Sequence, residues 1–279
     1  MKFLVRNLRL LHSGGNGDVF LGVRSDTGEL VVLKRLREHH VLEARKSFER
    51  EKRILARQLG GVVPLLGVGM DESGPYYVMP YFSGGSLTRY KATLSDAQLV
   101  AVATTIATAL CNLHAAQIAH GDIKPDNVLV SHDGHLQVAD PLGNGIGCTV
   151  LFSRNRGGTP GYWAPEVSGG GQISFAADVY SYGATLYELL TGRRPIDGQQ
   201  INPTAEGYAV APKIREIIVA CCSRHPGARP TMKEVLRMLG GQTWAALQTE
   251  RLQRQELVTI CIVGVAALAS VVLSHRSPG

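Results

Sequence analysis

The sequence predicts an α+β protein of two lobes, in which a strand-rich lobe precedes a larger helical one. Short apolar runs separated by turn residues fill positions 3–36, and apolar residues at helical spacing dominate from residue 96 onward. The glycine-rich stretch 83–85 lies between the two patterns and is the expected junction. Strands followed by helices along a chain are typical of α+β folds. A chain of 279 residues is long enough to bury a core in such a fold.

The smaller lobe is expected to consist of strands and one helix. Residues 3–36 are predicted to be strands, with the apolar run 30–33 as the clearest of them. Residues 41–59 are predicted to be a helix, because four apolar side chains fall roughly on one face: Phe48, Ile54, Leu55 and Leu59. Two further strands are expected at 62–68 and at 76–80.

The second half of the chain is predicted to be mainly helical. The segment 96–116 is long and apolar, with Ser95 as its N-cap, and residues 243–256 are polar and helix-prone. Residues 257–273 carry no charge, and their length is at the short end for a transmembrane helix. A buried core helix is the alternative, but an apolar helix outside the folded domain has only lipid to pack against. We therefore expect a single membrane span.

Charge and cysteine content limit the kinds of binding partner and the cellular compartment that we expect for this chain. The net charge is +6, and much of the excess lies between Lys34 and Arg57. No aromatic residues alternate with these basic residues as on a nucleic-acid platform, so a solvated helix face is expected and no nucleic-acid partner. The five cysteines form no C-x-x-C pair, which argues against zinc and redox motifs and favours a reducing compartment. Residues 1–6 lack the apolar core of a signal peptide.

A glycine-rich segment, residues 12–19, lies between two predicted strands. Glycine lets the backbone approach a phosphate group closely, so the segment could bind a nucleotide. The same residues also suit a plain hairpin turn, and the segment alone does not decide between the two.

The run His120-Gly121-Asp122-Ile123-Lys124-Pro125-Asp126-Asn127 combines an acid, a cation and an amide ahead of the apolar residues 128–130. Phosphoryl transfer needs these groups: a carboxylate that orients a hydroxyl, a cation near the moving phosphate and an oxygen ligand for Mg²⁺. The run resembles the catalytic loop of the eukaryotic-type (bacterial-like) Ser/Thr protein kinase family. The resemblance implies that Asp122 orients the substrate hydroxyl, Lys124 steadies the γ-phosphate and Asn127 binds Mg²⁺.

The same resemblance implies a nucleotide site. Lys34, at the end of an apolar strand, needs anionic partners if it is buried. The family supplies ATP phosphates and a helix glutamate, for which Glu51 fits the spacing better than Glu43 or Glu49. Met79 resembles the gatekeeper before the hinge, and the residues assigned to ATP binding are His12, Ser13, Gly14, Gly15, Gly17, Val19, Val32, Lys34, Glu51, Met79, Phe82 and Leu129.

The chain departs from the family pattern at several points. His12 stands where the family usually has a glycine, and Gly121 stands where regulated members have an arginine that pairs with a phosphorylated loop. Asp140-Pro141-Leu142-Gly143 replaces Asp-Phe-Gly. Asp140 keeps the carboxylate for Mg²⁺, and Pro141 is expected to restrict the backbone of Asp140.

Residues 158–166 resemble the end of a protein kinase activation segment, which argues against a small-molecule kinase. The resemblance gives Thr159 contacts with Asp122 and Lys124. It also implies structural roles for three further residues, namely Glu166, its partner Arg229, and Asp178, which would brace the catalytic loop.

The resemblance covers residues 4–240, with a first lobe at 4–82 and a second at 86–240. Residues 241–256 are then a juxtamembrane linker and 257–273 a transmembrane helix. The predicted function is a membrane-anchored Ser/Thr protein kinase with its catalytic domain in the cytoplasm, using ATP with Mg²⁺ (or Mn²⁺) and a protein substrate. The alternative is a membrane-anchored pseudokinase that binds nucleotide as a scaffold.

Overall fold

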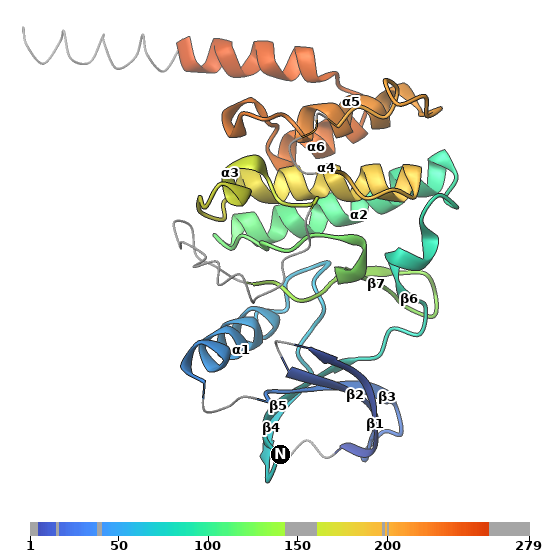
Figure 1. The fold of residues 1–279 in the computed structure, drawn as a ribbon, viewed down its shortest axis with the longest axis vertical. Coiled ribbons are helices and arrows are strands. Elements are labelled where there is room, and N and C mark those ends of the chain that lie inside the picture. Colours follow the sequence, from blue (N-terminus) through green and yellow to red (C-terminus); the bar gives the residue numbers. More distant parts are fainter. Residues whose placement is uncertain are drawn as a thin grey trace, which may run out of the picture.

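The protein consists of two stacked lobes, one rich in strands and one helical (Figure 1). The computed structural model describes residues 5–14, 17–37, 41–142, 161–196, 199 and 201–256. The predicted α+β architecture with the strand-rich lobe first is confirmed over these ranges. The predicted membrane span at 257–273 lies outside the described residues.

An antiparallel sheet forms the smaller lobe, in the order β1-β2-β3-β5-β4. Its strands are β1 (Val5–Gly14), β2 (Gly17–Arg24), β3 (Leu30–Arg35), β4 (Gly67–Asp71) and β5 (Gly74–Pro80). The prediction of a strand over 62–68 is wrong for most of that segment. Val63 donates its backbone N–H to the carbonyl of Val138, and Val138 donates to Gly61, so this stretch pairs with the larger lobe before β4 begins.

Helix α1 (Leu42–Leu55) lies beside the sheet, on the side of the larger lobe (Figure 1). Phe48, Ile54 and Leu55 are buried as the helical spacing predicts, and Leu59 packs partly buried against the same cluster. The helix ends short of the predicted residue 59. Gln58 has a positive φ of 49°, a left-handed conformation that cannot continue an α-helix.

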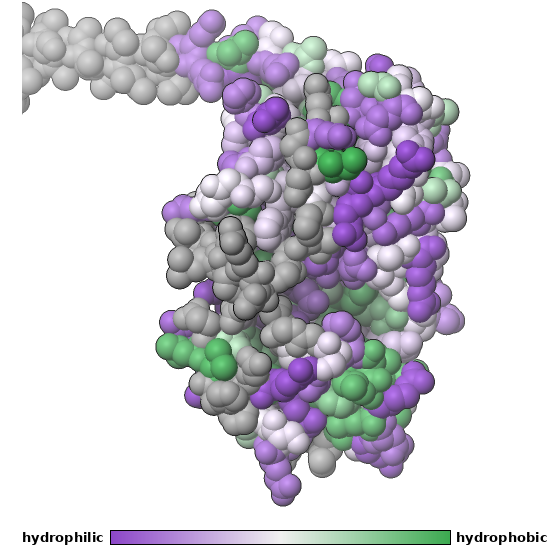
Figure 2. Space-filling view, viewed as in Figure 1, coloured by the Kyte–Doolittle hydropathy of each residue, from purple (hydrophilic) through white to green (hydrophobic). Residues whose placement is uncertain are grey.

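The two faces of this sheet differ. The inner face carries Val32, Tyr77 and Met79 into the main apolar core, which continues into the larger lobe. The outer face buries only a small separate cluster that includes Val31 and Val78. Apolar side chains also gather on the surface over β1, where Leu8, Leu10 and Leu11 are exposed (Figure 2). The inner face is therefore the one that joins the lobes.

The larger lobe is built around α2 and α4. Its helices are α2 (Asp96–Ala115), α3 (Pro165–Ser168), α4 (Phe175–Thr191), α5 (Pro212–Cys221) and α6 (Met232–Leu239), and its strands are β6 (Gly85–Ser86), β7 (Val128–Val130) and β8 (Leu136–Val138). Ser95 caps α2 as predicted, in a capping box with Gln98. By length and composition α2 is the one helix among the described residues that could cross a bilayer, but eight of its apolar residues are buried in this core.

Residues 244–256 form a further helix that lies against the larger lobe (Figure 1). Leu247 is buried, and the backbone N–H of Trp244 donates to Glu216 of α5 at 2.6 Å. Arg251 pairs with Glu234 of α6 at 2.6 Å. The helix-prone part of the predicted linker is thus a docked helix.

Candidate active site

The β1–β2 hairpin is closed by glycine where the chain turns. Gly14 lies opposite Gly17, and Gly17 has a φ of 127° that strongly favours glycine. A Cβ on Gly17 would also collide with the carbonyl oxygen of Arg35. Ser13 donates to Asp18 at 2.6 Å, so a side-chain bond ties the two strands beside the turn. Gly15 lies outside the described residues, whereas His12 lies on β1 opposite Val19.

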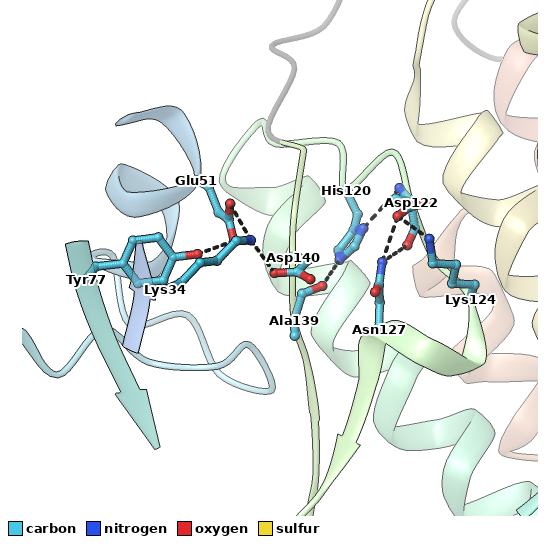
Figure 3. Close-up of polar contacts among 9 residues, drawn as sticks. All are labelled: Lys34, Glu51, Tyr77, His120, Asp122, Lys124, Asn127, Ala139 and Asp140. Atoms are coloured by element: carbon cyan, nitrogen blue, oxygen red, sulfur yellow. Dashed lines mark hydrogen bonds and ion pairs between the residues drawn. The ribbon is translucent and has the colours of Figure 1, made fainter. Parts of the chain in front are cut away.

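Lys34 lies at the centre of a buried charge cluster. Its Nζ is 2.8 and 3.0 Å from the two carboxylate oxygens of Glu51 on α1, and 2.9 Å from Oδ1 of Asp140 after β8 (Figure 3). Lys34 and Glu51 are nearly fully buried, while 44% of the Asp140 side chain is exposed. One ammonium therefore joins the sheet, α1 and the segment that follows β8.

The electrostatics of this cluster shift the pKa values of its two carboxyl groups in opposite directions. Burial raises the pKa of Glu51 to about 7, against the attraction of Lys34. Burial also opposes ionisation of Asp140, but Lys34 overcomes it and lowers that pKa to about 2. The carboxylates of Asp140 and Glu51 in turn outweigh burial and raise the pKa of Lys34. Asp140 is thus the carboxylate of the cluster that is ionised at neutral pH.

The backbone of Asp140 adopts an unusual conformation. Its φ is +56°, in the left-handed region. A residue before proline ordinarily prefers extended backbone, so this conformation opposes the local preference. The contact of Asp140 with Lys34 holds this residue, and the backbone bond from Leu142 N–H to the carbonyl of His120, at 2.8 Å, holds the chain just after it. Backbone strain held by surrounding contacts is characteristic of functional sites.

The catalytic-loop residues converge on one carboxylate. Lys124 Nζ lies 2.7 Å from Oδ2 of Asp122, and Asn127 Nδ2 donates to the same oxygen at 2.8 Å (Figure 3). Asn127 also donates to the backbone carbonyl of Asp122 at 2.8 Å. This arrangement fixes the carboxylate through Oδ2, and neither of these two side chains contacts Oδ1.

A buried aspartate of α4 holds the backbone of the loop that carries Asp122. Asp178 is 1% exposed and accepts from the backbone N–H groups of His120 and Gly121, each at 2.8 Å. Gly121 has a φ of 82°, and a Cβ there would lie 2.7 Å from Cδ1 of Ile173. Backbone conformation and crowding therefore both favour glycine where the family resemblance leads one to expect arginine.

Five of the residues assigned to ATP binding share one apolar cluster. Val32, Met79 and Phe82 are buried in the main core, and Val19 and Leu129 are partly buried against it. They come from both lobes, since Leu129 lies on β7 and the others lie on or just after strands of the first sheet. Such an arrangement can provide apolar contact with a flat ring from two sides.

The predicted structural pair is formed in the larger lobe. Arg229 binds both carboxylate oxygens of Glu166, at 2.6 and 2.8 Å, in a bidentate geometry. Thr159, which the resemblance directs at Asp122 and Lys124, lies outside the described residues.

Two side chains of this site were not recognised in the sequence. Tyr77 donates its hydroxyl to Glu51, and His120 contacts the backbone carbonyl of Ala139 at 3.0 Å through Nε2 (Figure 3). The signal for Tyr77 was available, because it lies two residues before Met79 and thus on the same face of the strand. His120 gave no such signal, since its partner is a backbone group.

The donors present suit a hard divalent cation. Asn127 donates through Nδ2 and so retains its amide oxygen as a ligand, and Asp140 provides an ionised carboxylate that is partly open to solvent. Mg²⁺ takes such oxygen ligands and usually adds water and phosphate oxygens. Asn127 and Asp140 therefore fit the predicted cation.

Comparison with known proteins agrees with this geometry. The family model described as "Protein kinase domain" matches residues 5–239. A probable LRR receptor-like serine/threonine-protein kinase of Arabidopsis thaliana is 34% identical over 275 residues, which cover 83% of this chain and 24% of that protein. The DNA damage-responsive serine/threonine-protein kinase RqkA of Deinococcus radiodurans is 34% identical over 207 residues, 68% of this chain and 30% of that protein.

A third relative is the serine/threonine-protein kinase PrkC of Bacillus subtilis, which is 30% identical over 200 residues, 69% of this chain and 31% of that protein. The chain spans about a third or less of the length of these relatives.

Proposed function

The chain belongs to the protein kinase family, and on that premise we propose that it is a Ser/Thr protein kinase, which transfers the γ-phosphate of Mg-ATP to a hydroxyl group of a protein. The observation that carries this proposal is the carboxylate of Asp122, held through Oδ2 by Lys124 and Asn127. A fixed carboxylate with one oxygen left for a substrate hydroxyl is what positioning catalysis requires.

Each remaining residue has a role in this proposal. Lys34, held between Glu51 and Asp140, binds the phosphates, and Asn127 and Asp140 bind the cation. ATP would supply the phosphoryl group, and Mg²⁺ (or Mn²⁺) held by Asn127 and Asp140 would offset the negative charge of its phosphates. The apolar cluster around Met79 and Leu129 receives the adenine ring.

Phosphate transfer by the purified full chain tests this proposal. The chain is incubated with labelled ATP, Mg²⁺ and a generic basic protein, and the products are analysed for phosphoserine and phosphothreonine. We expect transfer by the wild type and a roughly 10²–10⁴-fold lower rate for Asp122→Asn, with ATP affinity nearly unchanged.

The same experiment addresses the alternative, a nucleotide-binding scaffold. That alternative predicts calorimetric binding of Mg-ATP by the wild type but no transfer to any hydroxyl. Equal transfer rates in the wild type and Asp122→Asn would contradict the role of Asp122.

We further propose that residues 257–273 anchor the protein in a membrane as a single span, with the kinase domain on the cytoplasmic side. The proposal is supported by the composition of this segment, which has no charged residue from Leu257 to Leu273. An arginine at the centre of a transmembrane helix costs about 2.5–3.5 kcal/mol. Val265→Arg should therefore release the protein from membranes in a carbonate wash, whereas the wild type should stay bound. A wild type that washes off as freely would exclude the anchor.

A further inference from the structure

Tyr77 is a buried tyrosine of β5 to which the proposed chemistry gives no part. Its side chain is 0% exposed, and its hydroxyl donates to Oε1 of Glu51 on α1 (Figure 3). A buried tyrosine hydroxyl needs a hydrogen-bond partner, so a phenylalanine would fill this apolar position without that requirement. Packing therefore explains the ring of Tyr77 but does not explain its hydroxyl group.

The register of the sheet brings Tyr77 and Lys34 to the same carboxylate. The two residues lie directly opposite each other on β5 and β3, so their side chains leave the same face of the sheet. Lys34 reaches both oxygens of Glu51, and Tyr77 reaches Oε1. The two strands thus hold one side chain of α1 from adjacent positions.

The ring of Tyr77 supports the same contact. It packs against Phe48 of α1 with ring centroids 5.1 Å apart, and the Nζ of Lys34 lies 5.9 Å from its centroid. Helix α1 has Val41 at its N-cap position, which gives no side-chain cap bond. Its position therefore depends on contacts along its length, of which the bonds to Glu51 are polar and directional.

We propose that Tyr77 is a positioning residue, whose hydroxyl holds Glu51 of α1 against Lys34 and so keeps the Lys34 ammonium in place for the phosphates. The inference rests on the proposed function, because the position of Lys34 matters for catalysis only if the site binds ATP. If α1 moves away, the hydroxyl of Tyr77 and the carboxylate of Glu51 both lose a buried partner. The bond therefore favours the conformation with α1 docked.

The decisive variant is Tyr77→Phe, which removes the hydroxyl alone. We expect the KM for ATP to rise roughly 5–30-fold, since a smaller fraction of molecules has Lys34 in place before ATP binds. The kcat should change less than about twofold, because saturating ATP restores the competent state. Tyr182→Phe is the matched control, since Tyr182 is also fully buried and donates its hydroxyl to the carbonyl of Ala103 in the larger lobe. It should leave the KM for ATP unchanged.

A double-mutant cycle separates positioning from general destabilisation. In a Glu51→Ala background the hydroxyl of Tyr77 has lost its acceptor, so adding Tyr77→Phe should leave the KM for ATP unchanged. An unaltered KM in the single variant Tyr77→Phe, or an equal rise in both backgrounds, would overturn the proposal.

Hydrogen exchange in the nucleotide-free full chain tests Tyr77 without any catalysis. Amides of α1 should exchange roughly 5–30-fold faster in Tyr77→Phe than in the wild type, and at the wild-type rate in Tyr182→Phe. If the wild type transfers no phosphate, the proposed function fails while this comparison still decides the role of Tyr77. Unchanged exchange of α1 in Tyr77→Phe would refute that role.

Discussion

Two ion-pair sites in the described part of the chain, each with a buried cation, differ in how completely their charges are matched. In the larger lobe, the Arg229 side chain is 0% exposed, and both carboxylate oxygens of Glu166 face it. Three backbone carbonyls accept from the same guanidinium, those of Ala176, Ser223 and Arg224. One cation meets one anion, and the guanidinium donates at each of its three nitrogens.

Between the lobes, the match is incomplete. Lys34 is a single ammonium that serves the carboxylates of both Glu51 and Asp140. Burial, with the nearby carboxylate of Asp140, raises the pKa of Glu51 to about 7, and Asp140 stays ionised with 44% of its side chain exposed. This cluster therefore has two carboxyl groups for one ammonium, and the Asp140 side chain is partly exposed to solvent.

The difference separates a structural pair from a reactive one. A pair of matched charges has no net charge left for a ligand, so it serves to fix geometry. An unmatched cluster with perturbed pKa values and a solvent-facing carboxylate is suited to bind a further cation or a charged ligand. The comparison thus supports structural roles for Glu166 and Arg229, and a ligand-binding role for Asp140.

Arg229→Ala should break the matched pair and have the largest effect on stability. It leaves the carboxylate of Glu166 without its partner, so the free energy of unfolding should fall by about 3–5 kcal/mol. Urea unfolding followed by tryptophan fluorescence measures the change. Arg229→Lys should lose less, because an ammonium keeps the charge but cannot bind both carboxylate oxygens in a fork. An unfolding midpoint for Arg229→Ala equal to that of the wild type would contradict the structural role.

Lys34→Met should have a smaller effect on stability and a large effect on turnover. Glu51 can take up a proton and Asp140 is partly solvated, so the free energy of unfolding should fall by only about 1–3 kcal/mol. Phosphate transfer should fall roughly 10²–10³-fold, since a fixed cation near the phosphates is lost. The same unfolding and transfer assays measure both quantities. A stability loss as large as that of Arg229→Ala would remove the distinction between the two sites.

The sequence predicted the parts of this comparison that depend on residue type and spacing. Lys34 and Glu51 were paired from the family resemblance, and the structure brings them within 2.8 Å. The α+β order and the cap of α2 at Ser95 followed from local patterns. Such features depend on short segments of sequence, in which the spacing of apolar residues and the capping residues determine the local structure.

The parts that depend on long-range backbone contacts were not predicted. The segment 62–68 was expected to be a strand, but the backbone of Val62 and Val63 pairs with Val138 of β8, which lies far along the chain. The left-handed backbone of Asp140 opposes the local preference before proline, and Tyr77 acquires its role only when β3 and β5 pair. Local propensity gives way at such positions because tertiary contacts decide the conformation.

A third ion pair extends the comparison to the surface of the larger lobe. Arg251 of the terminal helix 244–256 lies 2.6 Å from Glu234, and both side chains are partly exposed, by 28% and 17%. The guanidinium also lies over the ring of Trp244, 5.1 Å from its centroid. Solvent screens such a pair, so its contribution should be the smallest of the three.

Glu234→Gln tests this pair and should lower the free energy of unfolding by about 0.2–1 kcal/mol at neutral pH. Glutamine keeps an oxygen for the cap bonds from Thr231, so the substitution removes mainly the charge. Burial raises the pKa of Glu234, but the bonds from Arg251 and Thr231 outweigh it and hold that pKa below its ordinary value of 4.5.

A carboxyl group with a lowered pKa in the folded state stabilises the protein above its unfolded pKa, and this contribution is lost as the pH falls through the folded value. The difference in stability between the wild type and Glu234→Gln should therefore be constant near pH 7 and shrink below about pH 4.5. Urea unfolding of both proteins across this range measures it. Glu250→Gln is the control, since Glu250 pairs with Arg237 at a more exposed site, with both side chains 37% exposed, and should change stability less. A loss of 3 kcal/mol or more for Glu234→Gln would equal the loss of about 3–5 kcal/mol expected when the pair of Arg229 and Glu166 is broken. Burial of the arginine would then not be what separates strong pairs from weak ones in this molecule.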